Sequence, residues 1–308
     1  MYRIGIDLGG TNIAVGVVNE NYEIVAHHSV PTGASRPAEE VIRDMGDAVE
    51  AVLVKAGVSI DQCESMGIGS PGNCDSERGV VARAYNLGWF DVPVCAMLQE
   101  RFGIPVRLSN DANCAALAET VAGAAVGCEN MVLITLGTGV GGGIIIDGKI
   151  YAGMRSAGAE LGHMLLVLDG EPCTCGRKGC WETYASATAL IRQAKKAAAD
   201  HPESLLAQAE EITGLAVFQA ADKGDAVAQA VIDQYCVYVA AGFTDLVNSL
   251  APEMILLGGG ISRQGERILA PMREYVMNNC FGQKDGAIPV IKAAALGNEA
   301  GIIGAAAL

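Results

Sequence analysis

Residues 131–150 read MVLITLGTGVGGGIIIDGKI: an apolar run, a glycine-rich turn carrying a threonine, a second apolar run, and an Asp-Gly turn into a third run. The N-terminus has the same layout, because residues 3–8 alternate between apolar and other side chains before Gly9-Gly10 turns the chain into a second apolar run. Such alternation predicts strands, and the glycines predict tight turns. The sequence therefore predicts an internal duplication in which a β-hairpin opens each half.

The rest of the chain alternates between strand-like and helix-like patterns, which predicts an α/β protein. Its 308 residues exceed one typical domain. We expect two lobes, residues 1–115 and residues 116–297, with a C-terminal helix at 298–308 packing back on the first lobe. The other predicted elements are strands at 22–29, 65–69, 106–109 and 254–257, and helices at 37–56, 112–121, 188–199, 205–212 and 226–249.

Composition excludes several classes of function. The longest apolar runs, such as residues 235–243, are shorter than the roughly 20 residues of a membrane span. A net charge of −14 has the wrong sign for binding nucleic acid. Ten cysteines without a signal peptide indicate a reducing compartment. We therefore expect a cytoplasmic protein with neither membrane nor nucleic acid among its partners.

A cluster of metal-ligating residues lies within ELGHMLLVLDGEPCTCGRKGCWE at residues 160–182. His163, Cys173, Cys175 and Cys180 are one imidazole and three thiolates, the ligand set of a closed, structural zinc site. The alternatives are a chance group of buried thiols or a disulfide. The compact C-x-C-x4-C spacing beside a histidine favours zinc.

Two glutamates, Glu160 and Glu182, flank these ligands. A metal that fixes the loop would also fix two hydrogen-bond acceptors, an arrangement suited to a polyhydroxylated ligand. A lone acidic residue in a loop is more often a solvated carboxylate, but proximity to the metal ligands favours the binding role.

The two glycine-rich turns, each with a threonine, favour a nucleotide phosphate chain lying between the lobes, held by backbone N–H groups and hydroxyls. Ordinary hairpins with positive φ are the alternative. Residues 137–142 match G-x-G-x-x-G, but the following residues continue as a strand and not as a helix, so a dinucleotide fold is excluded. A P-loop is absent, because Gly148-Lys149 is followed by Ile150.

Asp111 follows a predicted strand and begins a predicted helix. The positive end of the helix dipole would keep this carboxylate ionised and ready to accept a proton, as phosphoryl transfer to a hydroxyl requires. The alternative is that Asp111 only caps its helix.

Several motifs in a fixed order resemble the sugar kinases of the ROK (repressor, open reading frame, kinase) group, most closely its bacterial glucokinases. They are DLGGT at 7–11, SPG at 70–72, NDAN at 110–113, GTGVGGG at 137–143, ELGH at 160–163, CTCGRKGCWE at 173–182 and GGG at 258–260. The resemblance spans nearly the whole chain. It implies the duplicated actin-like, Hsp70-like ATPase fold (ribonuclease H-like), in which two α/β lobes close over ATP and a sugar.

The resemblance also assigns roles to residues. It implies that Asp111 is the general base, that Asp7 helps to hold Mg²⁺, that Gly259 lies near the adenosine, and that His163 contacts both zinc and sugar. A homodimer is expected on the same ground. The expected phosphate ligands are Gly9, Gly10, Thr11, Asn12, Thr138 and Gly139, and the expected sugar ligands are Gly72, Asn110, Asp111, Glu160, His163 and Glu182.

We therefore expect a kinase that converts ATP and D-glucose to glucose 6-phosphate, with Mg²⁺ as cofactor. The motifs do not separate glucose from N-acetylmannosamine, N-acetylglucosamine, mannose or fructose. A non-catalytic sugar-sensing regulator is the alternative of a different class. Regulators of this group carry a helix-turn-helix domain before DLGGT, for which a strand starting at Tyr2 leaves no room, and Asp111 favours catalysis. A structural actin-like polymer would not explain the zinc cluster.

Overall fold

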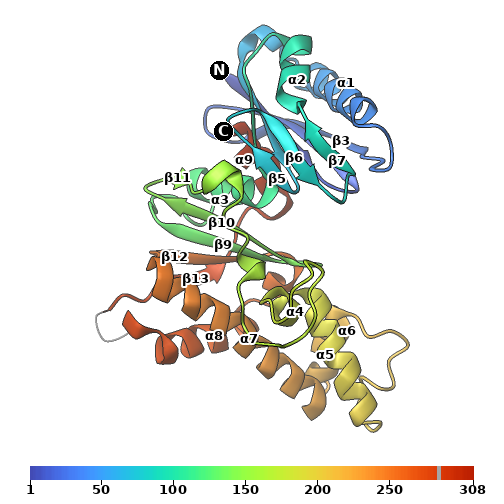
Figure 1. Ribbon diagram of the computed structural model, residues 1–308, viewed down its shortest axis with the longest axis vertical. Coiled ribbons are helices and arrows are strands. Elements are labelled where there is room, and N and C mark those ends of the chain that lie inside the picture. The colour runs from blue at the N-terminus through green and yellow to red at the C-terminus, as the bar shows by residue number, and fades with distance from the viewer. Residues whose placement is uncertain (283–285) are drawn as a thin grey trace. The chain divides into compact units, whose positions relative to one another are not determined.

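The computed structural model describes residues 1–282 and 286–308. The chain forms two compact units (Figure 1). Unit 1 comprises Met1–Leu133, Gly143–Ala159 and Ala294–Leu308, and unit 2 comprises Ile134–Gly142 and Glu160–Ala293. The lobe boundary predicted after residue 115 lies within a continuous helix, α3 (Asp111–Val121). The position of this boundary stays a prediction.

A five-stranded sheet in unit 1 has the order β3-β2-β1-β4-β8. The opening hairpin pairs antiparallel, whereas β1, β4 and β8 run parallel, which confirms the strands expected in this half. The strands are β1 (Tyr2–Leu8), β2 (Asn12–Val18), β3 (Ile24–Pro31), β4 (Cys63–Ser70) and β8 (Val106–Asn110).

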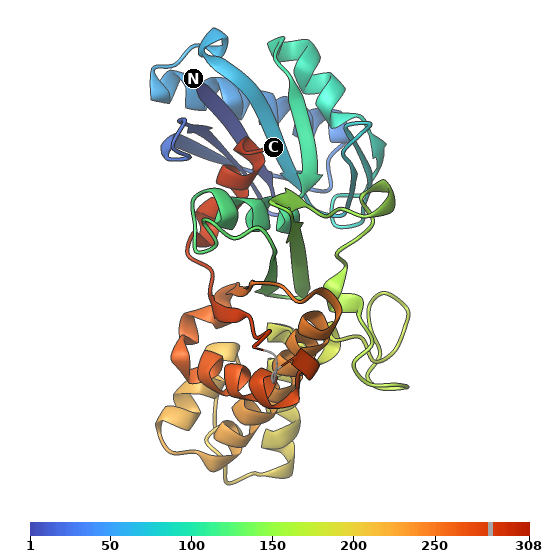
Figure 2. The ribbon, with the colours of Figure 1, turned by 90° about the vertical axis from the view of Figure 1, so that its left-hand side faces the viewer.

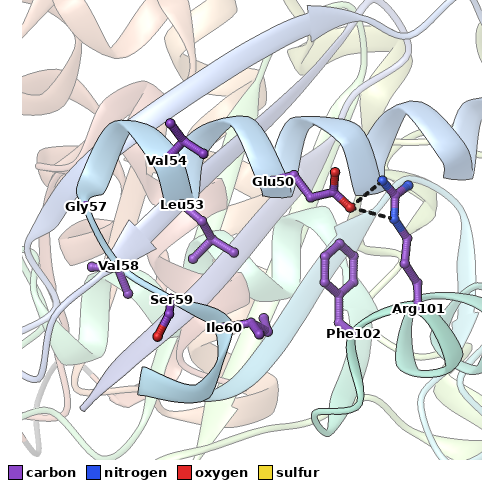
Figure 3. A pocket seen from close by; sticks show the side chains of 9 residues that line it. All are labelled: Glu50, Leu53, Val54, Gly57, Val58, Ser59, Ile60, Arg101 and Phe102. Carbon is purple, nitrogen blue, oxygen red and sulfur yellow. Dashed lines mark hydrogen bonds and ion pairs between the residues drawn. The ribbon is translucent and has the colours of Figure 1, made fainter.

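The two faces of this sheet differ because side chains alternate along a strand. Ile4, Ile6 and Leu8 of β1 are fully buried in a core shared with α1 (Ala38–Ala56) and α2 (Val94–Phe102). Figure 3 shows the edge of this layer, where Arg101 of α2 hydrogen-bonds Glu50 of α1 beside a hollow of about 560 Å³.

The other face of β1 carries Gly5 and Asp7 and lies against α9 (Ala300–Ala306), the red C-terminal helix in Figures 1 and 2. A Cβ atom on Gly5 would overlap the carbonyl oxygen of Ile302, and one on Gly67 of β4 would overlap that of Ala305. Glycine in the strands therefore allows the backbone of α9 to touch the sheet.

A second sheet has the order β11-β10-β9-β12-β13, which repeats the strand order of the first. This repetition confirms the internal duplication. The strands are β9 (Met131–Leu136), β10 (Val140–Ile146), β11 (Lys149–Ile150), β12 (Met254–Gly258) and β13 (Val290–Ala293).

Several short elements were not expected from the sequence, and the strand β13 of the second sheet is one of them. The strands β5 (Asn73–Asp75), β6 (Val80–Ala84) and β7 (Trp89–Val92) form a separate antiparallel sheet. The helices are α2 and α6 (Gly214–Asp222), and α6 is capped by the hydroxyl of Thr213. These elements are too short to show a clear period.

The helix predicted at residues 205–212 is wrong. The carboxylate of Asp225 accepts hydrogen bonds from the Ser204 hydroxyl (2.6 Å) and the Leu205 N–H (2.5 Å), and Ser204 Oγ accepts from the Leu206 N–H (3.1 Å). Side chains thus hold N–H groups at the start of the segment in a turn, an alternative that serine and aspartate offer to helix formation.

The helices α5 (Ala187–Asp200) and α7 (Ala226–Leu250) agree with the sequence within a few residues. The helix expected to begin near Ser262 is α8 (Glu266–Asn279), and α4 (Glu182–Ala185) was not expected. Among the described residues, α7 alone has the length and apolar composition of a membrane span. Half of its apolar window is buried by the rest of the protein, as in the core helix of a globular domain.

The contact between α3 and α9 generates a prediction about stability. A Cβ on Gly304 would overlap the carbonyl oxygen of Cys114, a backbone atom that cannot rotate away. We expect Gly304→Ala to lower the free energy of unfolding by about 1–3 kcal/mol in denaturant titrations. Gly260→Ala is the control, because its Cβ would meet no atom within 4 Å. Equal stability of the two variants would contradict the close contact.

Candidate active site

Two carboxylates of unit 1 come together from distant parts of the chain. Asp7 lies on the α9 face of β1, and a Cβ on Gly301 would overlap its carboxylate. Asp111 begins α3 directly after β8. Burial and the nearby charge of Asp111 raise the pKa of Asp7 to about 6. Two carboxylates that repel each other in this way favour a bound cation.

Asn110, and not Asp111, caps α3. Its Oδ1 accepts hydrogen bonds from the N–H groups of Ala112 (2.9 Å) and Asn113 (3.4 Å), and its Nδ2 donates to the carbonyl of Gly72 (3.1 Å). The interpretation of Asp111 as only the helix cap is therefore wrong. Asp111 occupies the first turn, where its carboxylate accepts from the Ala112 N–H (2.8 Å).

Gly72 requires glycine for two reasons. Its φ of 85° lies in the left-handed region, and a Cβ would overlap the carbonyl oxygen of Arg83. The SPG turn thus packs against β6, and the Gly72 carbonyl accepts a hydrogen bond from the side chain of Asn110. The structure brings Gly72, Asn110 and Asp111 together at the ends of β4 and β8, which are neighbouring parallel strands.

The first glycine turn joins β1 to β2. The Gly9 N–H donates to the Asn12 carbonyl (2.9 Å), and Thr32 fixes the turn by donating from its hydroxyl to the Gly9 carbonyl (2.7 Å). Gly10, Thr11 and Asn12 are exposed. Four of the six residues expected to bind phosphate, Gly9 to Asn12, therefore form one solvent-facing turn.

The second glycine turn joins β9 to β10 and is anchored to α5. The Thr188 hydroxyl donates to the Thr138 carbonyl (2.9 Å), and the Ala187 N–H donates to the Gly137 carbonyl (2.9 Å). Gly259 follows β12 with φ of 85°, and a Cβ there would overlap the carbonyl of Leu136 at the end of β9. Thr138, Gly139 and Gly259 thus lie at the same end of the second sheet.

The ligand atoms of His163, Cys173, Cys175 and Cys180 lie within 4.8 Å of one another. Cys173 Sγ is 3.7 Å from His163 Nδ1, and Cys175 Sγ is 3.6 Å from Cys180 Sγ. Tetrahedral zinc with its usual bond lengths separates such ligands by about 3.3–3.8 Å. The donor set therefore fits zinc. The described residues, which include all ten cysteines, contain no disulfide.

Arg177 contacts the cysteine cluster, and the sequence did not single it out. Its guanidinium donates to the His163 carbonyl and to Cys180 Sγ (3.7 Å). Its backbone N–H lowers the pKa of the Cys175 thiol to about 6. A cation inside a cysteine cluster stabilises thiolates. The position of Arg177 between Cys175 and Cys180 was therefore the sequence signal that could have identified it.

Glu182 connects the cysteine cluster to the second glycine turn. Its Oε2 accepts from the Val140 N–H (2.9 Å), and its Oε1 accepts from Cys173 Sγ (3.9 Å). A Cβ on Gly139 would overlap Oε2. The interpretation of Glu182 as a solvated loop carboxylate is wrong. Glu160 is exposed, immediately before the 3₁₀ helix η3 (Leu161–His163).

The expected sugar ligands are divided between the units. Gly72, Asn110 and Asp111 belong to unit 1, and Glu160, His163 and Glu182 belong to unit 2. Each unit also carries one glycine turn, because Gly9 lies in unit 1 and Gly139 in unit 2.

Two sheets of the same strand order, each opening with a glycine-turned hairpin, define an ATPase of the actin-like, two-lobe class. The ROK family model matches residues 3–308, and the chain belongs to the ROK family.

Similar proteins include kinases and regulators. A glucokinase of Halalkalibacterium halodurans is 38% identical over 98% of this chain and 93% of that protein. A ROK glucokinase structure from Streptomyces griseus, in complex with glucose and AMPPNP, is 38% identical, with a TM-score of 0.82, over 100% of this chain and 98% of that chain. A xylose repressor of Caldicellulosiruptor bescii is 32% identical over 90% of this chain and 70% of that protein.

The raised pKa of Asp7 predicts a pH dependence of stability. Folding raises this pKa from its usual 3.8 to about 6, so the folded state holds the proton more tightly than the unfolded state. The stabilisation is complete below the usual value and is lost as the pH rises through about 6. In metal-free protein, we expect wild type to lose stability relative to Asp7→Asn between pH 4.5 and 7.5, by the order of 1 kcal/mol. Parallel curves in thermal unfolding would contradict the shift.

Proposed function

We propose that the chain is an ATP-dependent glucokinase, which transfers the γ-phosphoryl group of ATP to D-glucose and releases glucose 6-phosphate and ADP. The observation that carries the proposal is the Asp7–Asp111 pair, a proton acceptor beside a carboxylate suited to a metal ion. Glucokinases that match this chain over nearly its full length support the choice of sugar.

Asp111 is the general base in this proposal. Its carboxylate takes the proton of the 6-hydroxyl as that oxygen bonds to the γ-phosphorus and the bond from this phosphorus to the bridging oxygen of ADP breaks. Asn110 supports Asp111 because its side chain fixes both the first turn of α3 and the SPG turn. The sugar would therefore meet a carboxylate whose backbone is held from two sides.

The other sugar ligands in the proposal are Gly72, Asn110, Glu160, His163 and Glu182. His163 Nδ1 faces Cys173, which leaves Nε2 for a sugar hydroxyl while Nδ1 serves a metal. A metal ligand whose second ring nitrogen is also hydrogen-bonded has a fixed orientation. The zinc would thus act as a structural element that aims the imidazole.

The nucleotide is assigned to the two glycine turns. Gly9, Gly10, Thr11 and Asn12 would present N–H groups and polar side chains to the phosphates from one turn, and Thr138 and Gly139 from the other, with Gly259 near the adenosine. Mg²⁺, when bound, would neutralise phosphate oxygens, and Asp7 would hold it through water. The proximity of Asp7 to Asp111 supports a cation there.

Three further proposals concern the whole molecule. The lobes divide into residues 1–115 with 298–308, and residues 116–297.

The chain forms a homodimer. A hollow of about 550 Å³ lined by α5 and α7, including Val227, Val231 and Tyr238, offers a surface for the second copy. The location proposed for the chain is the cytoplasm, as for an enzyme that acts on ATP and a small sugar.

The first test is a coupled ADP-release assay with ATP, Mg²⁺ and a panel of glucose, mannose, fructose, N-acetylglucosamine and N-acetylmannosamine. We expect the highest kcat/KM with glucose. Asp111→Asn should lower kcat by about 10²–10⁴-fold, because the proton acceptor is lost, and change the glucose KM much less. Asp61→Asn, an exposed aspartate of the same unit, is the control and should retain wild-type rates.

The outcomes separate the alternatives. Preference for another hexose or hexosamine would replace glucose as substrate and leave the role of Asp111 intact. Binding of glucose without turnover of any sugar would refute the kinase and indicate a regulator, the class to which the xylose repressor belongs. Full activity in Asp111→Asn would refute this residue as base.

The second test concerns zinc. Metal analysis should find one zinc per chain, and Cys173→Ser should reduce that content and lower the Tm, because binding to a folded four-ligand site stabilises the fold. Cys128→Ser, a cysteine outside the cluster, is the control and should keep its zinc. Stoichiometric zinc in Cys173→Ser would rule out the proposed ligand set.

A further inference from the structure

Glu119 is a buried carboxylate that no proposed binding or catalytic step uses. Its side chain is 1% exposed. Oε1 accepts hydrogen bonds from the backbone N–H groups of Ala295 and Leu296 (2.9 Å each), and Oε2 accepts from that of Ala124 (2.7 Å). All three partners are donors, so an ionised carboxylate satisfies them and an amide cannot.

These contacts lie where the chain returns to unit 1. Unit 2 ends at Ala293, and the last segment of unit 1 starts at Ala294. Oε1 of Glu119 therefore binds the second and third residues after the crossing. The carboxylate thus accepts hydrogen bonds from two backbone N–H groups of this connecting segment that would otherwise lack a protein partner.

The same segment touches one site carboxylate of unit 1, Asp7, and the helix α3 that carries the other, Asp111. After Leu296 it continues into α9, where Gly301 lies against the carboxylate of Asp7. Gly304 lies against the backbone of Cys114, in the same helix as Asp111. A displacement of the returning segment would therefore also displace Asp7 and the first turns of α3.

Glu119 is on α3 as well, eight residues after Asp111 and about 12 Å along the helix axis. One rigid helix therefore carries Asp111 at its first residue and the clamp on the returning segment near its last turn. Close packing transmits shifts between such elements because the interior cannot deform continuously.

We propose that Glu119 is a positioning residue for phosphoryl transfer, which clamps the segment returning from unit 2 to α3 and so holds Asp111 in its catalytic position. The proposal rests on the glucokinase function proposed above. Glu119 itself touches neither substrate. Its loss should therefore reduce the rate of the chemical step more than the binding of sugar.

The test is Glu119→Gln, which has the same shape but places a donor against one of three N–H donors. We expect kcat with glucose and ATP to fall about tenfold and the glucose KM to stay within about twofold. Hydrogen exchange should accelerate in peptides covering residues 294–299 and also in those covering residues 106–114. Gly123→Ala is a second variant, because its Cβ would overlap both Oε2 and the Cα atom of Glu119 and so displace this residue without changing its carboxylate chemically.

Val52→Ala is the matched control for stability. It removes buried volume from α1, away from the clamp, and should lower the Tm without the change in kcat. If kcat of Glu119→Gln and Gly123→Ala stays within about twofold of wild type, or if faster exchange is confined to residues 294–299, the coupling to Asp111 is refuted.

Failure of the glucokinase function would look different, because wild type would then turn over no hexose. The exchange pattern still tests the clamp in that case. Faster exchange at 106–114 in both variants supports it, and unchanged exchange there refutes it.

Discussion

The close approach of α9 to the first sheet and to α3 is the constraint on which the unit 1 site depends. Gly5 and Gly67 admit the α9 backbone onto the sheet, and Gly304 admits it onto α3. Side chains at these positions would separate the layers by more than packing allows. The parallel order β1-β4-β8 brings Asp7 of β1 near Asp111, which follows β8, and α9 packs against both β1 and α3, so the charge of Asp111 raises the pKa of Asp7 within this layer.

The periodicity of apolar residues predicted the elements that have one uniformly apolar face. The hairpin of β1 and β2, and its repeat in the second half, were evident because apolar alternation and turn glycines agree. Residues 205–212 were mistaken for a helix because composition favours one, whereas Asp225, distant in sequence, binds the Leu205 N–H and the Ser204 hydroxyl and holds the start of the segment in a turn. A partner that far along the chain leaves no local signal.

The motifs, through their family resemblance, gave the candidate site residues, but not how these are held. Glu182 was expected to flank a metal loop, and the structure adds its bond to the Val140 N–H in the glycine turn. Arg177 and Glu119 were missed because their partners are backbone groups and thiols that only the fold assembles. Sequence patterns report side-chain type, whereas these roles depend on which backbone N–H or carbonyl the fold exposes nearby.

The contacts already made by each side chain limit what it can offer a sugar. Asn110 uses Oδ1 for two N–H groups and one Nδ2 hydrogen for Gly72, so it has one N–H left to donate. Glu182 accepts from Val140, and an ionised carboxylate has about four acceptor positions, so it can still accept from hydroxyls. In the proposed function, a sugar hydroxyl that accepts from Asn110 would satisfy its remaining N–H, and a hydroxyl that donates to Glu182 would use one of its free acceptor positions. A hydroxylated ring supplies both donors and acceptors, whereas an apolar ligand would leave these groups unpaired.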